Sequence, residues 1–132
     1  MGAYSQSKLA CLMFAYEMQR RLENAGHQTM STAAHPGVSI TNLVQHTPMW
    51  MKIVFAPFIP FITHSPENGA KPTLYAAHGS DVNGGEYFGP TGFDQMKGKA
   101  GKVDAKPHAH DENVAKKLWE VSEELTKTSY LS

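Results

Sequence analysis

The stretch Tyr4-Ser5-Gln6-Ser7-Lys8-Leu9-Ala10 decides how the rest of this sequence is interpreted. It opens an apolar run with helical spacing that continues to about Ala25. Tyr4 and Lys8 are four residues apart, so a helix places their side chains on one face, one turn apart. A tyrosine has a pKa of about 10, and a nearby ammonium group stabilises its phenolate form. The pair can therefore act as a general acid and base toward a carbonyl or an alcohol.

The helix expected over residues 5–25 has apolar residues on two faces. One face holds Leu9, Leu12, Met13 and Tyr16, and the other holds Cys11, Phe14, Ala15, Met18 and Leu22. Two apolar faces predict burial on two sides, against a sheet and against a second helix or a partner chain. Gly26 is expected to end the helix as its C-terminal cap.

The remaining sequence predicts two short strands and two further helices. The strands are expected at residues 28–34, before a turn at 35–37, and at residues 84–90 between glycines. A helix should begin after Ser65 as N-cap with Pro66 in its first turn, run to about Ala77, and contain Pro72 at a kink or tightened turn.

The last part of the chain predicts a surface loop and then a helix. Residues 91–110 are rich in glycine and lysine, which is typical of a loop, and Asp111 can cap the helix that follows. Its apolar stripe consists of Val114, Leu118, Val121 and Leu125. Helices alternating with strands predict an α/β fold with a parallel sheet, and two strands are too few to complete one.

Composition excludes several classes of protein. The 132 residues include twelve basic and twelve acidic side chains without a basic cluster, which argues against a nucleic-acid partner. The single cysteine, Cys11, excludes an intramolecular disulfide, and the first residues lack a signal-peptide pattern, so we expect a cytoplasmic protein. The apolar run at 53–62 is too short to span a bilayer and contains two prolines, so no transmembrane segment is expected.

Three further stretches of the sequence resemble parts of the same family pattern as the opening motif. The stretches Ala34-His35-Pro36-Gly37-Val38 and Thr41-Asn42-Leu43 follow the helix, and Gly85-Glu86-Tyr87-Phe88-Gly89-Pro90 comes later. Together with residues 4–10 they resemble the short-chain dehydrogenase/reductase family, in its retinol-dehydrogenase-like branch. The resemblance covers the whole chain, and its motifs are most specific in residues 1–45.

This resemblance implies a role for each matching residue. Tyr4 would be the catalytic acid/base, and Lys8 would lower its pKa and bind the ribose of the cofactor. The cofactor-binding positions implied beside Lys8 are Pro36 and Gly37 in the turn next to the nicotinamide, Val38 at its carboxamide, and Thr41 at the carboxamide or pyrophosphate. Residues 42–64 would cover the substrate, and their Trp50, Phe55, Phe58 and Phe61 would favour a small apolar carbonyl or alcohol.

The sequence also departs from the family pattern. It has no Gly-x-x-x-Gly-x-Gly phosphate turn and no counterpart of the catalytic serine that precedes the tyrosine. We therefore expect residues 1–132 to form a single partial domain, the C-terminal part of a Rossmann-like doubly wound parallel sheet without its dinucleotide-binding strands. NAD or NADP would serve the full-length enzyme, and this chain alone would bind neither.

Two hypotheses about function remain open from the sequence. The chain is either a fragment of an NAD(P)-dependent short-chain oxidoreductase, inactive alone, or a noncatalytic module that self-associates. In both cases we expect a homo-oligomer, formed through helix 5–25 or through exposed strand edges, because a truncated sheet leaves apolar surface uncovered.

Two further segments offer weaker alternatives. His108-Ala109-His110-Asp111 could chelate a metal ion, but a loop without a third positioned ligand favours solvated side chains, so no metal site is expected. Met49-Trp50-Met51 could contact lipid, although a substrate lid or core packing is favoured because the stretch lacks a basic amphipathic face.

Overall fold

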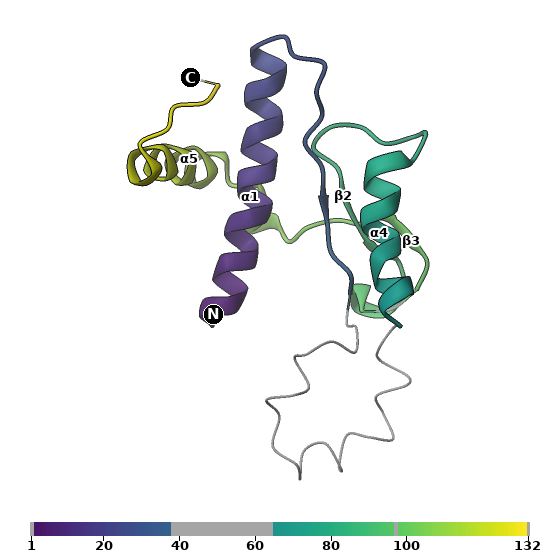
Figure 1. The fold of residues 1–132 in the computed structure, drawn as a ribbon. Coiled ribbons are helices and arrows are strands. Elements are labelled where there is room, and N and C mark those ends of the chain that lie inside the picture. The colour runs from purple at the N-terminus through teal and green to yellow at the C-terminus, as the bar shows by residue number, and fades with distance from the viewer. Residues whose placement is uncertain (1, 38–64, 97, 132) are drawn as a thin grey trace. The chain divides into compact units, whose positions relative to one another are not determined.

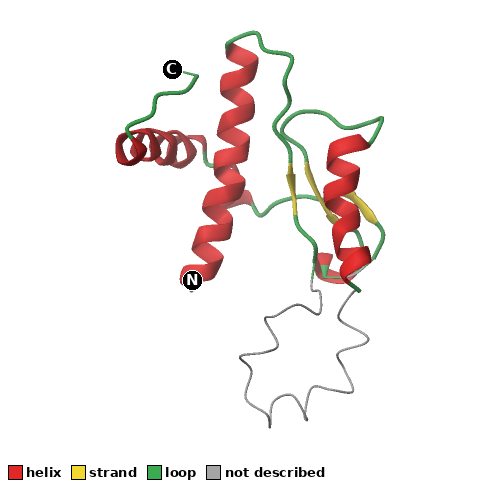
Figure 2. Cartoon of the chain, viewed as in Figure 1, coloured by secondary structure: helices red, strands yellow, loops and turns green. Residues whose placement is uncertain are grey.

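The computed structural model describes residues 2–37, 65–96 and 98–131. Its helices and strands, in chain order, are α1 (Ala3–Asn24), β1 (Ala33–Ala34), α4 (Pro66–His78), β2 (Tyr87–Pro90), β3 (Ala100–Lys102) and α5 (Glu112–Thr126) (Figure 1). Short 3-10 turns lie at Phe93–Gln95 and Pro107–His110. Figure 2 shows the same chain with helices in red and the three short strands in yellow.

The chain divides into two compact units, each of which is described by itself. The first unit comprises Met1–Ala33, Asn83–Tyr87 and Asp104–Ser132, and the second comprises Ala34–Val82 and Phe88–Val103. That residues 1–132 form one partial domain stays a prediction.

Helix α1 ends at the glycine that the sequence indicated. Gly26 has φ +70°, the left-handed conformation that glycine adopts without steric cost. Its N–H donates to the Glu23 carbonyl at 3.0 Å, and the His27 N–H donates to the Leu22 carbonyl at 2.9 Å. These bonds satisfy carbonyls of the last helical turn, so the prediction of Gly26 as the helix stop is confirmed.

The core of the first unit lies where α1 contacts α5. Trp119 of α5 is 2% exposed, and its ring stacks on Phe14 of α1 with centroids 4.6 Å apart. The Arg21 guanidinium lies 4.8 Å from the centroid of the Trp119 ring, a cation–π contact. One side of α1 is therefore buried against a second helix, as its apolar pattern predicts.

The apolar pattern of α1 predicts its buried residues only in part. Met13 and Leu22 are buried, but Cys11 is exposed. A charged residue, Glu17, is 6% exposed and forms ion pairs with Arg20 at 2.7 Å and Arg21 at 2.8 Å. Burial of a carboxylate is tolerated here because both of its oxygens accept charge-assisted hydrogen bonds.

The sheet has the order β1-β2-β3. The Ala33 N–H donates to Glu86 and the His35 N–H donates to Phe88, so β1 and β2 advance in the same direction and are parallel. Strand β3 pairs antiparallel with β2, with Gly89 opposite Gly101.

Three predictions about strands and loops need correction. The strand expected at 84–90 is confined to Tyr87–Pro90, and Gly84 and Gly85 lie in a turn before it. Residues 91–110 are not simply a surface loop, because they contain β3 and both 3-10 turns; Ala100–Lys102 lacks the alternating pattern that marks a strand. The strand expected at 28–34 is reduced to Ala33–Ala34. Before it, the Ser31 carbonyl accepts a hydrogen bond from the Gly85 N–H at 2.8 Å.

The N-caps of both remaining helices are confirmed. The Ser65 side chain accepts from the Asn68 N–H at 3.4 Å, with Pro66 in the first turn, and the Asp111 carboxylate accepts from the Val114 N–H at 3.1 Å. Pro72 lies inside α4 with its ring buried.

The apolar stripe of α5 is not the face that the helix buries. Ala115 and Trp119 are buried, whereas the stripe residues Val114, Val121 and Leu125 are 52%, 40% and 79% exposed. With its helices and small mixed sheet, the structure confirms the α/β class. None of the helices in the described ranges is long and apolar enough to cross a membrane.

Replacing Trp119 should destabilise the fold more than replacing a neighbour on the same helix. Trp119→Ala removes a fully buried ring and leaves a cavity, so the free energy of unfolding should fall by about 3–5 kcal/mol. The control Val114→Ala alters a half-exposed side chain and should change stability by no more than about 0.5 kcal/mol. Urea denaturation followed by circular dichroism measures both, and equal effects would contradict the assignment of Trp119 to the core.

Candidate active site

The structure brings Tyr4 and Lys8 together at the N-terminal end of α1. The Lys8 Nζ lies 5.5 Å from the centroid of the Tyr4 ring, on the same helical face. Tyr4 is 67% exposed, and the Ser7 hydroxyl donates to its carbonyl at 2.8 Å. Helical spacing alone therefore brings the pair together.

The ammonium of Lys8 faces the ring of Tyr4, which is a cation–π arrangement. To stabilise a phenolate, the ammonium must instead approach the phenolic oxygen. Both residues are exposed, so a change of the Lys8 rotamer can bring the ammonium there. The geometry permits acid–base chemistry, and among the described residues both side chains stay exposed. A carbonyl substrate would also need a surrounding wall that keeps water away.

Pro36 and Gly37 lie in the second unit, directly after β1. Gly37 has φ +70°, and a Cβ added there would lie 2.5 Å from the Met96 carbonyl oxygen and 2.6 Å from Pro90 Cγ. Glycine is therefore required at this position twice, for its backbone conformation and for the space beside it. Among the described residues, 35–37 form no backbone hydrogen-bonded turn and no bend, so the sharp turn predicted there is not confirmed. The name Pro36–Gly37 turn is used for the segment that the His35 side chain closes by accepting from the Gly37 N–H.

His35 contacts this turn and was not assigned a role from the sequence. Its Nδ1 accepts a hydrogen bond from the Gly37 N–H at 3.2 Å. The imidazole lies over Gly89 of β2, where any side chain would overlap its ring. Burial lowers the pKa of His35, and a hydrogen bond with the Gln95 side chain opposes this effect. The only sequence signal was the position of His35 next to Pro36.

The other residues implied by the family resemblance lie outside the described residues. These are Val38 and Thr41 at the cofactor, and Trp50, Phe55, Phe58 and Phe61 in the substrate loop. Their assigned roles stay predictions.

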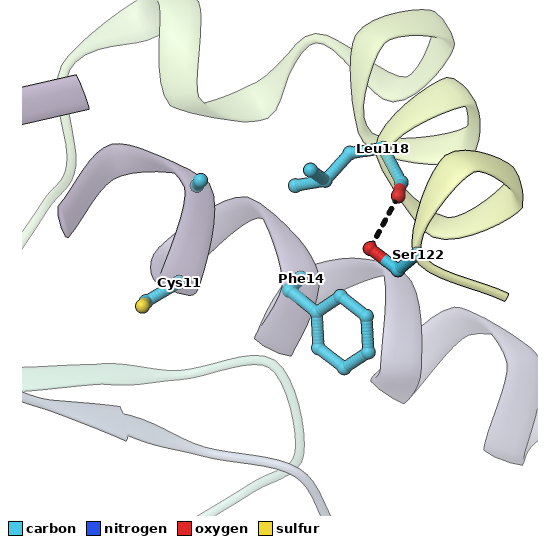
Figure 3. A pocket seen from close by; sticks show the side chains of 5 residues that line it. Cys11, Phe14, Leu118 and Ser122 are labelled. Atoms are coloured by element: carbon cyan, nitrogen blue, oxygen red, sulfur yellow. Dashed lines mark hydrogen bonds between the residues drawn. The ribbon is translucent and has the colours of Figure 1, made fainter. Parts of the chain in front are cut away.

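A groove on the first unit was not anticipated from the sequence (Figure 3). It has a volume of about 320 Å³ and is lined by Ala10, Cys11 and Phe14 of α1 and by Leu118 and Ser122 of α5. The Ser122 hydroxyl donates to the Leu118 carbonyl at 2.7 Å, shown as the dashed line in Figure 3. Because this hydroxyl serves its own helix, the groove presents mainly apolar atoms.

His110, one of the two histidines of the His108–His110 segment, packs against an aromatic ring of α1. The ring of His110 stacks on Tyr16 with centroids 4.9 Å apart. Burial raises the pKa of Tyr16, and the nearby Tyr87 and Asp104 raise it further. Within the described ranges, no group of three or more histidine, cysteine or carboxylate side chains could hold a metal ion.

Comparison with known proteins gives relatives along nearly the entire chain. It is 36% identical to human (Homo sapiens) Retinol dehydrogenase 13 over 130 residues, covering 94% of this chain and 36% of that protein. It is 36% identical to human Retinol dehydrogenase 14 over 91% of the chain and 34% of that protein. Dehydrogenase/reductase SDR family member 13 of Bos taurus is 32% identical over 93% of the chain and 30% of that protein.

A solved structure shares both sequence and fold. An uncharacterized protein from Mycobacterium Paratuberculosis has a TM-score of 0.73 and 39% identity, and the match covers 97% of this chain and 40% of that one. No protein-family model matches. The resemblance to short-chain dehydrogenases and retinol dehydrogenases is thus confirmed, and so is the partial Rossmann-like fold. The chain spans about a third of the length of the curated relatives it matches.

Gly37 and Gly26 form a matched pair for testing the turn. Both have φ +70°, but a Cβ at Gly26 would meet no atom within 4 Å, whereas at Gly37 it would meet Met96 and Pro90. Gly26→Ala should lower the free energy of unfolding by about 1–2 kcal/mol from backbone strain. Gly37→Ala should lower it by at least about 1 kcal/mol more, because a neighbour must also move. Urea denaturation of both variants decides this, and equal losses would contradict the packing at Gly37.

Proposed function

We propose that this chain is part of an NAD(P)-dependent short-chain oxidoreductase that interconverts a small apolar carbonyl and its alcohol. One observation carries the proposal: Tyr4 and Lys8 share one helical face in a chain whose relatives are retinol dehydrogenases over more than nine-tenths of its length. The names of those relatives support an apolar alcohol as the substrate. Tyr4 would donate a proton to the carbonyl oxygen while hydride reaches its carbon.

The other roles follow the residues of the resemblance. Lys8 would stabilise the phenolate and bind the cofactor ribose. Pro36, Gly37, Val38 and Thr41 would meet the nicotinamide end of NAD or NADP. The compartment we propose is the cytoplasm, because a single cysteine needs no oxidising environment.

The proposed enzyme needs more than this chain. The match covers 30–36% of the length of these curated relatives. The sequence of this chain also lacks the glycine-rich phosphate turn. The pyrophosphate of a dinucleotide is usually held by backbone N–H groups at a helix N-terminus opened by such a turn. We therefore propose that the 132 residues are inactive alone.

Cofactor affinity tests this proposal directly. The isolated chain should bind NADH and NADPH with a dissociation constant no better than about millimolar, since the pyrophosphate contacts are missing. Isothermal titration calorimetry of the purified chain measures this. Micromolar binding of either cofactor would show that the chain holds a complete cofactor site.

Turnover tests the role of Tyr4. When the remaining part of the enzyme is supplied by a co-expressed segment, Tyr4→Phe should reduce carbonyl reduction at least about 100-fold, because the phenolic proton is used in the transition state. Cofactor binding should stay nearly unchanged. Tyr130→Phe is the matched control, since Tyr130 is also exposed and also loses only a hydroxyl. Normal turnover in Tyr4→Phe would disprove the catalytic role.

A second candidate function is a noncatalytic module that associates with another copy of itself. The groove at Ala10, Cys11, Phe14, Leu118 and Ser122 favours it, since an apolar surface of this kind is stabilised by a partner. Helix α1 was the element expected to mediate such association, together with the strand edges.

Sedimentation measurements separate this candidate from the first. At micromolar concentration the chain should form a dimer or larger oligomer. Cys11→Asp should shift it toward the monomer, because a partner that covers the groove would take the carboxylate out of water. Ser5→Asp is the control, since Ser5 lies on α1 outside the groove residues and is exposed. A monomeric wild-type chain with a cooperative melt would overturn self-association.

A further inference from the structure

The contacts of the His35 side chain restrict the conformation of the Pro36–Gly37 turn that follows it. The His35 Nδ1 accepts from the Gly37 N–H at 3.2 Å, which closes the turn across Pro36. Pro36 contributes no N–H of its own, so the Gly37 N–H is the first backbone donor after the histidine. The same imidazole lies over Gly89 of β2, where a Cβ would overlap it. The side chain is therefore held at both ends, by the turn and by the sheet.

The protonation state of His35 follows from this hydrogen bond. A nitrogen that accepts an N–H must carry a lone pair, so Nδ1 is unprotonated and the proton of the neutral ring is on Nε2. Burial lowers the pKa of His35, which favours this neutral form. Among the described residues, the side chain that acts on this pKa is the amide of Gln95, which does not titrate.

We propose that His35 is a positioning residue for the cofactor: its imidazole holds the Gly37 N–H and fixes the Pro36–Gly37 turn in the shape that meets the nicotinamide. This inference rests on the proposed function, in which Pro36 and Gly37 lie beside the cofactor. His35 touches neither substrate nor cofactor in this role. It acts through Gly37, which holds a left-handed φ of +70°.

The proposal has a defined dependence on pH. The ordinary pKa of histidine is about 6.5, and the folded value lies below it. Above about pH 6.5 the ring is neutral in both folded and unfolded chains, and the Gly37 bond is complete. As pH falls through the folded pKa, Nδ1 gains a proton and the bond is lost, so the turn loosens on the acidic side only.

Nuclear magnetic resonance of the ¹⁵N-labelled 132-residue chain tests the hold on the turn. The Gly37 amide resonance should shift along one titration with a midpoint below 6.5, while the Gly26 amide, which bonds a backbone carbonyl, stays in place. In His35→Asn the titration should vanish but slow amide exchange should persist, because an asparagine oxygen also accepts from the N–H two residues on. In His35→Phe, Gly37 exchange should accelerate about fivefold to tenfold, as expected for one lost hydrogen bond.

Two results would overturn the role of His35: a Gly37 resonance insensitive to pH, or equal exchange rates in the wild type and His35→Phe. If His35→Phe does not fold, the wild-type titration and His35→Asn still decide the question. Addition of NADH to the chain co-expressed with the remaining part of the enzyme then tests the function separately. It should shift the Gly37 amide in the wild type and in His35→Asn, and its failure to do so would overturn the cofactor site while the hold of His35 on the turn stands.

Discussion

The backbone of β2 is hydrogen-bonded along both of its edges, and this pairing is the constraint on which the sheet depends. Phe88 accepts from His35 on the β1 side and faces Lys102 of β3 on the other. Its side chain is fully buried, and its ring centroid lies 5.4 Å from the ring centroid of Tyr75. This central strand has only four residues, and they must pair with strands on both sides and also contact the core. Few residue types satisfy these requirements at each of its positions. Gly89 follows Phe88 because the space above it is occupied by the His35 imidazole.

Local rules explain the parts of the structure that the sequence predicted well. The ends of α1, α4 and α5 depend on residues within one turn of each boundary, so Gly26, Ser65 and Asp111 are recognisable without knowledge of the fold. The Tyr4–Lys8 pair belongs to the same class, since helical spacing alone brings its members together.

The parts that sequence reasoning missed depend on distant partners. Gln19 is buried because the Ser31 N–H, twelve positions on, satisfies its side-chain oxygen. Glu17 is the exception, since Arg20 and Arg21 lie within about one turn of it on the same helix, and an apolar pattern reveals neither burial. Strand β3 exists because β2 offers it an edge, although its own three residues have weak strand propensity. His35 could be recognised only as a neighbour of the Pro-Gly turn, since its contacts with Gly89 and Gln95 come from residues more than fifty positions away.

The buried amide of Gln19 links the helix of the candidate site to a glycine far along the chain. Its oxygen accepts from the Ser31 N–H at 2.7 Å and its nitrogen donates to Glu23 at 2.7 Å, so the side chain has no room to turn away. A Cβ at Gly84 would overlap this amide. Any larger residue at 84 is therefore compatible only with a shorter one at 19. In related chains these two positions should vary as a pair. Glutamine at position 19 should occur with glycine at position 84, and a small residue at 19 with alanine at 84, a covariation that an alignment of such chains can reveal.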